Sequence, residues 1–268
     1  MKLIILILLL PALAFGQECS FKWDNDVVKP GGLDHNYTNG NTLKCGKWSV
    51  TAEMYTPEDK SSEIVDTGSR PWDGLFYLQY EHKINIKHGE AVILQPRIGM
   101  LGRASGMQAL QTEVHDHWGW GDHPTWAGQN ASELALSLVA SKRNREYLQS
   151  IVGDSMVENE YGVEVGNVKD RVFLCQTLQK HFYKYLYPYT GICGEAIAFN
   201  SHLDGRMFHD NTYTVNKNWF VAEAKLGLKL YFPEWGFGID YAYKYRTEEY
   251  DKQVGRHTYG SLEFIFEF

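Results

Sequence analysis

Three polar side chains that could together form an acid–base site, one imidazole and two amides, recur at helical spacing near the middle of the chain. Gln108, Gln111 and His115 stand at positions i, i+3 and i+7, so on a helix they share one face and can point into one site. A neutral imidazole can take a proton from water near neutral pH, and an amide one turn earlier can hydrogen-bond and orient its ring. We therefore expect His115 to act as a general base that Gln111 positions.

The segment that carries this face holds the only convincing helix signal in the sequence. Ser105 and Gln108 fit a capping box, and Met107, Leu110 and Val114 recur at helical spacing to form a narrow apolar stripe. Such a stripe must be covered in a folded protein. We therefore expect this short helix to lie against another element, with its polar face beside the contact.

Acidic residues near the N-terminus are candidate partners for the histidine. The sequence Asp24-Asn25-Asp26 places two carboxylates around one amide within an expected strand. Carboxylates are costly against lipid, so these side chains are expected to face a lumen or a metal ion. His117 and His123 raise the alternative of a zinc cluster, although no His-x-x-x-His ligand pair is completed on the helix.

Alternating hydrophobicity predicts the elements that must position these groups. Along 235–245 every odd position is apolar or aromatic and the even positions are small or charged, and 220–232 and 261–268 largely repeat the pattern. The first two runs are about twice as long as a typical soluble strand of roughly five or six residues. Long strands with one apolar and one polar face are typical of membrane β-barrels, whereas a soluble β-sandwich that buries the same faces is the alternative.

Composition favours the barrel. Aromatic residues make up 14% of the chain, with 17 Tyr and 8 Trp, and these residue types collect at both edges of a membrane barrel. Beyond the N-terminal segment no apolar run approaches the length of a spanning helix, and the mean hydropathy is −0.38. The net charge of −7 gives no support for nucleic-acid binding.

We therefore predict an all-β fold, a transmembrane antiparallel β-barrel of about 12 strands with one short helix next to the active site. An even number of strands is usual for single-chain bacterial barrels. The expected strands are 20–28, 37–45, 47–56, 74–85, 90–102, 132–147, 156–167, 171–182, 195–207, 219–232, 235–248 and 258–268.

The chain is expected to hold a signal peptide at 1–16 and one barrel domain at 17–268. The first 16 residues contain one lysine, an unbroken apolar run and then small residues before the expected cleavage site. A lipoprotein at Cys19 is the weaker alternative, because Gly-Gln-Glu precedes it. No linker, repeat or low-complexity tract divides the remainder.

The four cysteines follow the expected cleavage site, so they lie in an oxidising compartment and are expected to form disulfides. Pairing Cys19 with Cys45 and Cys175 with Cys193 is the simplest of three connectivities. The sequence does not decide among them.

Several motifs occur in the order found in the lipid A 3'-O-deacylase family of outer-membrane enzymes, the LpxR type, and the chain resembles that family. The matching pieces are Asn25-Asp26, Tyr37-Thr38-Asn39-Gly40, Met54 to Pro57, the Arg70 segment, Gly102 to Gly106, Gln111 to His115, and the pair Trp126 and Gln129. Similarity resumes at the C-terminal strands and is thin between about 145 and 215.

The resemblance implies a twelve-stranded barrel with its active site between the wall and a helix near the outer leaflet. It also implies chemistry similar to that of secreted phospholipase A2. A histidine takes a proton from water, the hydroxide attacks an ester carbonyl, and calcium with nearby donors stabilises the oxyanion.

Carried over by motif, the catalytic residues are expected to be His115, Asn25, Asp26, Thr38, Lys60 and Gln111. Lys60 is the only lysine between the Tyr-Thr-Pro motif and Arg70, although its offset from that motif differs from the family's. Calcium prefers hard oxygen ligands, and we expect Asp26 and Asp122 to supply them, with Asp116 as the alternative to Asp122.

The expected function is Ca²⁺-dependent hydrolysis of an acyl ester, the 3'-O-linked acyloxyacyl group of lipid A, by an integral protein of the bacterial outer membrane. The expected partner is lipopolysaccharide, with no nucleic acid, and we expect a monomer. Two alternatives remain open: a barrel that keeps the motifs but is inactive, with a structural or lipid-binding role, and a small passive channel.

Overall fold

The computed structural model describes residues 18–29, 37–60, 62–63, 67–118, 124–148, 154–210 and 213–268. The expected signal peptide at 1–16 and the expected metal ligand Asp122 lie outside these ranges. Among the described residues, no helix combines the length and apolar character needed to cross a bilayer.

Strands dominate the described chain. They are β1 (Cys19–Asn25), β2 (Tyr37–Cys45), β3 (Trp48–Tyr55), β4 (Asp73–Tyr80), β5 (His82–Lys87), β6 (Glu90–Leu101), β7 (Glu133–Leu148), β8 (Ser155–Gly166), β9 (Lys169–Lys180), β10 (Leu186–Asn200), β11 (Phe220–Phe232), β12 (Phe237–Arg246) and β13 (His257–Phe266). The helical segments are η1 (Asp26–Val28), η2 (Gly102–Ser105), α2 (Met107–Trp118), α3 (Ser201–Asp204) and η3 (Pro233–Trp235).

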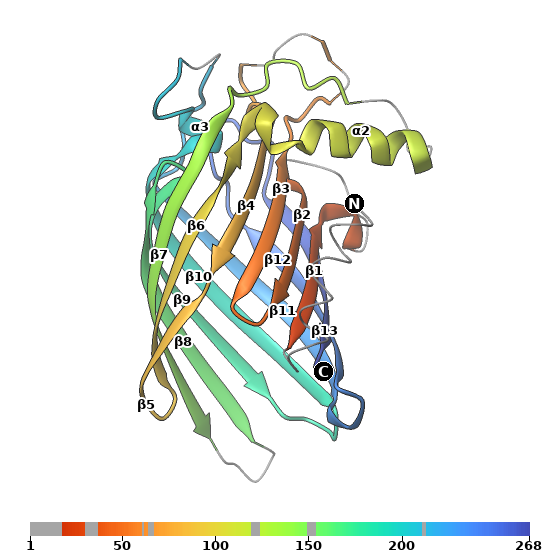
Figure 1. Ribbon diagram of the computed structural model, residues 1–268, viewed down its shortest axis with the longest axis vertical. Helices are drawn as coiled ribbons and strands as arrows, with labels where there is room; N and C mark the ends of the chain where they lie inside the picture. Colours follow the sequence, from red (N-terminus) through yellow and green to blue (C-terminus); the bar gives the residue numbers. More distant parts are fainter. Residues whose placement is uncertain are drawn as a thin grey trace.

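The strands form one closed antiparallel barrel (Figure 1). Each strand pairs with its sequence neighbours, β1 pairs with β13, and β4 pairs with β6. β5 continues the register of β4 on β6, because Gln79 pairs with Arg97 and His82 with Leu94. Only Glu81 separates the two strands, so together they occupy one of the twelve strand positions around the barrel. The predicted barrel of about 12 strands is confirmed.

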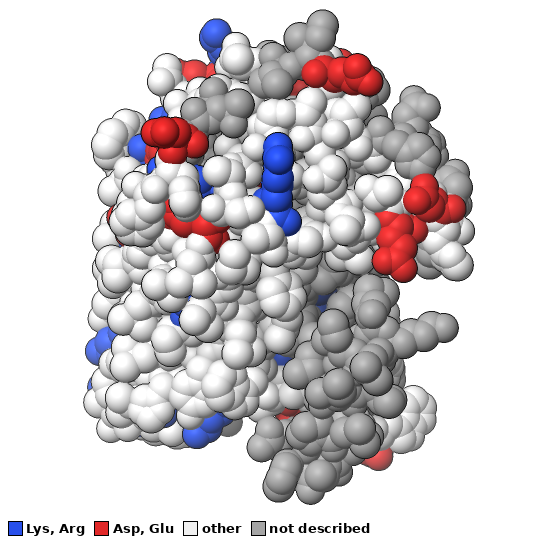
Figure 2. Space-filling model, turned by 45° about the horizontal axis from the view of Figure 1, so that its top comes forward, with Lys and Arg blue, Asp and Glu red and all other residues white. Residues whose placement is uncertain are grey.

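The alternating pattern separates a lipid face from a lumen. On β7, Leu134, Leu136 and Leu138 are exposed, whereas Ser137 and Ser141 are buried. This arrangement leaves apolar side chains on the outside, as a bilayer requires. Most of the wall visible in Figure 2 is uncharged, and acidic side chains gather mainly toward its upper end.

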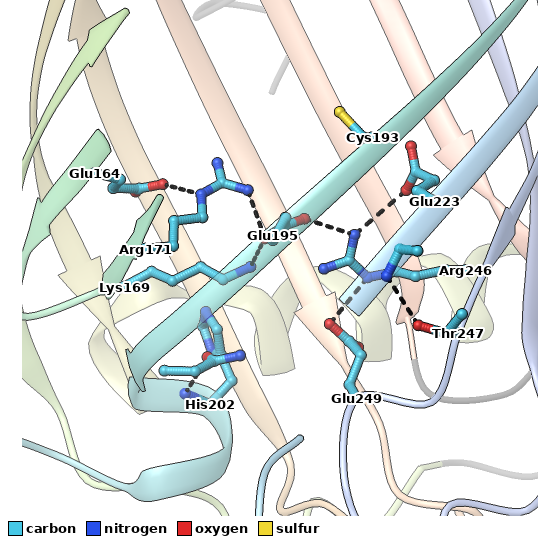
Figure 3. Close-up of polar contacts among 12 residues, drawn as sticks. Glu164, Lys169, Arg171, Cys193, Glu195, His202, Glu223, Arg246, Thr247 and Glu249 are labelled. Atoms are coloured by element: carbon cyan, nitrogen blue, oxygen red, sulfur yellow. Dashed lines mark hydrogen bonds and ion pairs between the residues drawn. The ribbon is translucent and has the colours of Figure 1, made fainter. Parts of the chain in front are cut away.

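Charged side chains fill the lumen. Glu195 of β10 accepts hydrogen bonds from Lys169 and Arg171 of β9, each at 2.8 Å, and from Arg246 of β12 at 2.9 Å. Figure 3 shows these three cations converging on one carboxylate. Arg246 also donates to Glu249 at 3.1 Å. The lumen is therefore lined by ion pairs that join the adjacent strands β9 and β10 and bridge from β10 over β11 to β12.

The two ends of the barrel differ in the length of their connections. At one end β2 joins β3 through residues 46–47 and β5 joins β6 through 88–89. At the other end lie α2 and α3, in the connections after β6 and β10 (Figure 1). Bacterial barrels have short periplasmic turns and longer extracellular loops, so α2 lies at the extracellular end.

Two predicted strands end at least three residues earlier in the structure. Strand 20–28 stops at Asn25, because the chain turns into η1 and Val28 passes over β13 at Gly260, where a Cβ atom would lie 2.8 Å from the Val28 carbonyl carbon. Strand 195–207 instead spans β10 and α3. Asn200 begins that helix, since its side-chain oxygen accepts a hydrogen bond from the His202 N–H at 3.1 Å.

Both disulfides join neighbouring strands. Cys19 pairs with Cys45 across β1 and β2, and Cys175 pairs with Cys193 across β9 and β10. This is the simplest of the three connectivities that the sequence left open.

Candidate functional site at the extracellular rim

The apolar stripe of α2 is covered by the end of the barrel. Met107 lies in a buried cluster with Met54, Trp72 and Trp126, and Leu110 packs against it. Close approach is possible because residue 74 of β4 is glycine, where a Cβ atom would lie 2.8 Å from the Met107 side chain. The predicted contact of this helix with another element is confirmed.

The start of α2 differs from the expected capping box. Ser105 ends η2, where its hydroxyl donates to the Gly102 carbonyl at 2.6 Å and accepts from the Met107 N–H at 3.4 Å. Gly106 then takes a left-handed conformation with φ of 76°, which suits glycine, before the helix begins. Gln108 is exposed, so it does not share the buried side of the helix with Gln111.

Gln111 has a different hydrogen-bond partner from the one expected. Its side-chain oxygen accepts a hydrogen bond of 2.8 Å from the indole N–H of Trp126, and not from His115. Trp126 stacks on Trp72 with ring centroids 4.8 Å apart and adopts φ of 54°. Positive φ is strained for a large side chain, and such strain is often found at functional sites. The hydrogen bond between Gln111 and Trp126 therefore holds α2 at the rim of the barrel.

His115 lies half-buried on the last turns of α2. Its Nδ1 atom is buried and has no hydrogen-bond partner within the described part of the chain. Buried polar atoms are generally satisfied by protein, water or ligand. A ring nitrogen that is not bonded to the described protein is suited to exchanging a proton with a bound group.

Asn25 and Asp26 lie where the first strand ends. Asn25 donates to the Asn39 side-chain oxygen at 3.4 Å, and the Trp23 indole donates to the same oxygen at 2.8 Å. Asp26 opens η1 and is completely buried. A buried carboxylate in a tight turn is thus fixed at the upper end of β1, beside the upper end of β2.

Thr38 and Lys60 lie near this end of the barrel as well. Tyr37 pairs with Tyr55 and Asn39 with Met54, so Thr38 falls at a β-bulge, a feature common next to active sites. The backbone carbonyl of Lys60 accepts from the Thr125 N–H at 3.2 Å, one residue before Trp126. Residues 56–60 are thereby tied to the segment that holds Gln111.

One rim therefore brings together the elements that carry the predicted residues. α2 contacts β3 and β4. Met54 on β3 lies against Met107 of α2 and pairs with Asn39, which in turn pairs with Asn25. In Figure 1, α2 begins at the upper end of the barrel near β3 and extends outward beyond the barrel outline on the side of β1 to β3.

The residues described near Asp26 fit a calcium site only in part. Calcium takes six to eight oxygen ligands, which include carboxylates, carbonyls and water. Asp26 offers one buried carboxylate, and its expected partner Asp122 lies outside the described residues. Within the described ranges no three His, Cys, Asp or Glu side chains are arranged to hold a metal ion.

A buried cluster that we did not predict supports the same rim. The Asp73 carboxylate pairs with Arg206 at 2.5 Å and with the His202 Nδ1 atom at 2.8 Å, and accepts from Asn130 at 3.2 Å. It joins β4, α3 and the segment before β7. These residues are up to 133 positions apart, so no local sequence pattern indicates the contact.

The comparisons with known proteins identify the family. The model of the family described as "Outer membrane protein LpxR" matches residues 44–180 and 178–268. The chain belongs to the LpxR outer membrane protein family. The residues matched to the LpxR family model include Gln111 and His115, and they begin after Asn25, Asp26 and Thr38.

One solved structure shares the fold of this chain. LpxR from Salmonella typhimurium matches with a TM-score of 0.79 and 16% identity, covering 94% of this chain and 100% of that chain. The β domain of the Bordetella autotransporter BrkA matches at 0.48 with 9% identity, covering 94% and 99%, and the NanC porin at 0.39 with 8% identity, covering 94% and 98%. No curated protein sequence gives a significant match. The fold and the family together place this LpxR-family chain in the bacterial outer membrane as an integral protein.

Proposed function

We propose that this protein is a lipid A deacylase that hydrolyses the 3'-O-linked acyloxyacyl ester. The observation that carries the proposal is His115. It is a half-buried imidazole on a helix held at the extracellular rim, and its buried ring nitrogen is not bonded to the described protein. The rim is where the outer leaflet meets an LpxR-family barrel, so an ester of an outer-leaflet lipid can reach it.

The proposed reaction is a hydrolysis by activated water. His115 takes a proton from water as the water oxygen attacks the ester carbonyl carbon, and the proton then passes to the leaving alcohol oxygen. Asn25, Thr38 and Lys60 are the candidate donors to the carbonyl oxygen as negative charge develops on it. Gln111 acts through Trp126, because their hydrogen bond fixes the helix that carries the base.

Calcium is the metal we propose, with Asp26 and Asp122 as its carboxylate ligands. When bound there, it would supply positive charge that stabilises the developing oxyanion. The position of Asp26 supports this assignment, since its buried carboxylate lies at the end of β1 and carboxylate oxygen is a ligand that calcium prefers. Zinc is the less favoured alternative, because His117 is exposed and lies on another part of the helix surface from the buried Gln111.

One observation favours the alternative of an inactive barrel with a lipid-binding role. The oxygen of Gln111 is engaged with Trp126, so within the described residues no side chain orients the His115 ring. Under this alternative α2 would be a docking element for lipid rather than the carrier of a base.

Replacement of His115 by alanine distinguishes the two functions. We expect His115→Ala to abolish release of the acyl chain from lipid A in isolated outer membranes, as followed by mass spectrometry. Heat-modifiable migration on gels should be retained, because the barrel does not depend on this side chain. The matched control is His117→Ala, an exposed histidine of the same helix that should leave deacylation unchanged. Intact lipid A in cells that express the wild-type protein would contradict the deacylase proposal.

We also propose that the barrel acts as a monomer, which light scattering of the detergent-solubilised protein measures directly.

A further inference from the structure

Two arginines differ from all the others in the chain. Of the nine arginines in the sequence, seven form ion pairs with carboxylates. Arg103 and Arg256 are exposed, and neither has a carboxylate partner among the described residues. Arg103 stands next to α2 and so belongs with the proposed active site. Arg256 stands elsewhere on the rim, in the connection between β12 and β13.

Arg256 lies at the head of a groove on the outer wall. The floor is made of small outward-facing residues, Gly194 and Ala196 of β10 and Ala222 of β11, and the sides include Leu174 and Phe220. A Cβ atom at Gly194 would have no other atom within 4 Å, which shows how open the floor is. The groove has a volume of about 780 Å³, within the range of roughly 300–1,000 Å³ typical of ligand sites.

Outward orientation of the groove follows from the strand pattern. Cys193 and Glu195 of β10 line the lumen, so Gly194 and Ala196 between them face lipid. On β11 the same alternation puts Glu223 inside and Ala222 outside. The side wall is therefore in contact with acyl chains along its length.

The groove and α2 lie on opposite sides of the barrel. With β4 and β5 counted as one strand, β10 lies six strands from β3 in either direction around the twelve-stranded barrel. Both features occupy the extracellular end, because β12 ends and β13 begins there. A lipid bound in the groove would not compete for space with a lipid under α2.

The chemistry at the head of the groove fits a phosphorylated sugar lipid. Arg256 presents an unpaired guanidinium, a strong donor for phosphate, which lies 5.6 Å from the centre of the Tyr245 ring. The carboxylate of Glu248 is exposed on the same rim and can accept hydrogen bonds from sugar hydroxyls. An apolar floor below a cation and an acceptor matches acyl chains below a phosphate and a sugar.

We propose that this wall groove is a second lipid A site, distinct from the proposed catalytic site. One acyl chain lies over Gly194 and Ala196, and the phosphate bonds to Arg256. The site would hold a lipid A molecule at the barrel wall without hydrolysing it, since no histidine lines the groove among the described residues.

Native mass spectrometry of the full-length protein in detergent, titrated with purified lipid A, tests the proposal. All variants are made in a His115→Ala background, so that hydrolysis does not consume the lipid. We expect the parent to bind two lipid A molecules. Arg256→Ala should weaken one of the two sites roughly tenfold, the loss expected for one charge-assisted hydrogen bond. Gly194→Leu should fill the floor and remove the same site.

Two matched controls isolate the groove. Lys252→Ala removes an exposed cation of the same connection that does not line the groove, and Thr190→Leu adds bulk to the same face of β10 nearer the periplasm. Both should bind two molecules, and heat-modifiable migration verifies that every variant is folded. At the groove site, lipid A without phosphates should bind to the parent as weakly as complete lipid A binds to Arg256→Ala.

The proposal would be overturned if Arg256→Ala and Gly194→Leu bound as many lipid A molecules as the parent, with the affinity of the parent. Equal displacement by phosphatidylethanolamine would also overturn it, because the site would then be one for any phospholipid. These readouts are independent of deacylation, so the wall site can fail while the proposed function holds, and the reverse.

Discussion

The indole N–H of Trp126 donates a hydrogen bond of 2.8 Å to the side-chain oxygen of Gln111. This single contact joins the buried side of α2 to the segment that leads into β7. It is supported by the stack of Trp126 on Trp72 and by the packing of Met107. The position of His115, one turn beyond Gln111, therefore depends on an aromatic side chain that is not itself placed to react.

Replacing Trp126 by phenylalanine should loosen α2 while leaving the barrel intact. The ring still stacks, but the buried oxygen of Gln111 loses its donor, a change that costs about 1–3 kcal/mol. We expect faster amide hydrogen exchange in 107–118 and a lower kcat for lipid A deacylation. Trp219→Phe is the control, because Trp219 is exposed on the wall, and it should leave both measurements unchanged. Unaltered exchange in α2 would show that the hydrogen bond does not hold the helix.

Chelation and Asp26→Asn test the proposed calcium site. The amide keeps the size of the side chain but removes the charge that a hard cation needs. We expect a chelator to suppress deacylation by the wild-type protein and added Ca²⁺ to restore it, whereas Asp26→Asn should stay inactive at the same Ca²⁺ concentration. Deacylation that continues in the presence of the chelator would contradict the metal assignment.

Replacing Glu195 by glutamine should destabilise the barrel. The change leaves Lys169, Arg171 and Arg246 in the lumen without the carboxylate on which they converge (Figure 3). Breaking a buried ion pair costs about 3–5 kcal/mol, and the free energy of unfolding in urea should fall by about that amount. Glu234→Gln is the control, since that exposed carboxylate bonds only to Tyr185 among the described residues and should matter little.

The pairing of Glu249 predicts a loss of stability in acid. Burial acts to raise the pKa of Glu249, but Arg246 and Arg70 outweigh it and lower the pKa to about 2. An unfolded chain has a glutamate pKa of about 4.3, so the ion pairs contribute fully above about pH 5 and their contribution is lost as the pH falls to about 2.

The shift in the pKa of Glu249 corresponds to about 3 kcal/mol at neutral pH. We expect the free energy of unfolding of the wild-type protein to exceed that of Glu249→Gln by this order at pH 7, and the difference to shrink between pH 5 and pH 2. A difference that stays constant over this interval would mean that the carboxylate is not stabilised by its partners.

The filled lumen predicts a barrel that does not conduct. Arg171 and Arg246 converge on Glu195 inside the barrel, so we expect their side chains to obstruct the passage of ions. In planar bilayers the wild-type protein should show no stable channel openings, while the double change Arg171→Ser and Arg246→Ser should produce them. Steady conductance of the wild-type protein would instead support the passive-channel alternative.

Much of the barrel could be predicted because lipid on one side and a polar lumen on the other impose a period of two. The prediction was wrong where backbone chemistry overrides that period. Residues 186–194 contain Pro188 and two glycines, which suggest a turn, yet they belong to β10. Packing between strands explains why this segment is a strand and not a turn. The Tyr189 ring covers Gly227, which lies opposite it on β11, and a Cβ at Gly227 would lie 2.1 Å from that ring.

The site could be predicted in part. Helical spacing indicated α2 and its apolar contact, since both depend on neighbouring residues. The partner of Gln111 could not be predicted, because Trp126 follows it by a connection whose path the sequence does not specify. The cluster of Asp73 with His202 and Arg206 was missed for the same reason, as only the closed sheet brings these residues together.

Closure of the ring between β1 and β13 has a consequence for biogenesis. The two strands stand at opposite ends of the described sequence, with Cys19 against Phe266 and Asn25 against Gly260, so this seam cannot form before nearly all of the chain is present. Contacts of such long separation form slowly. Because η1 rests on Gly260, the loop that carries Asp26 gains its support only when that seam closes. Under the proposed function, an assembly intermediate with an open seam is therefore expected to be inactive, so half-inserted protein would not hydrolyse the lipid around it.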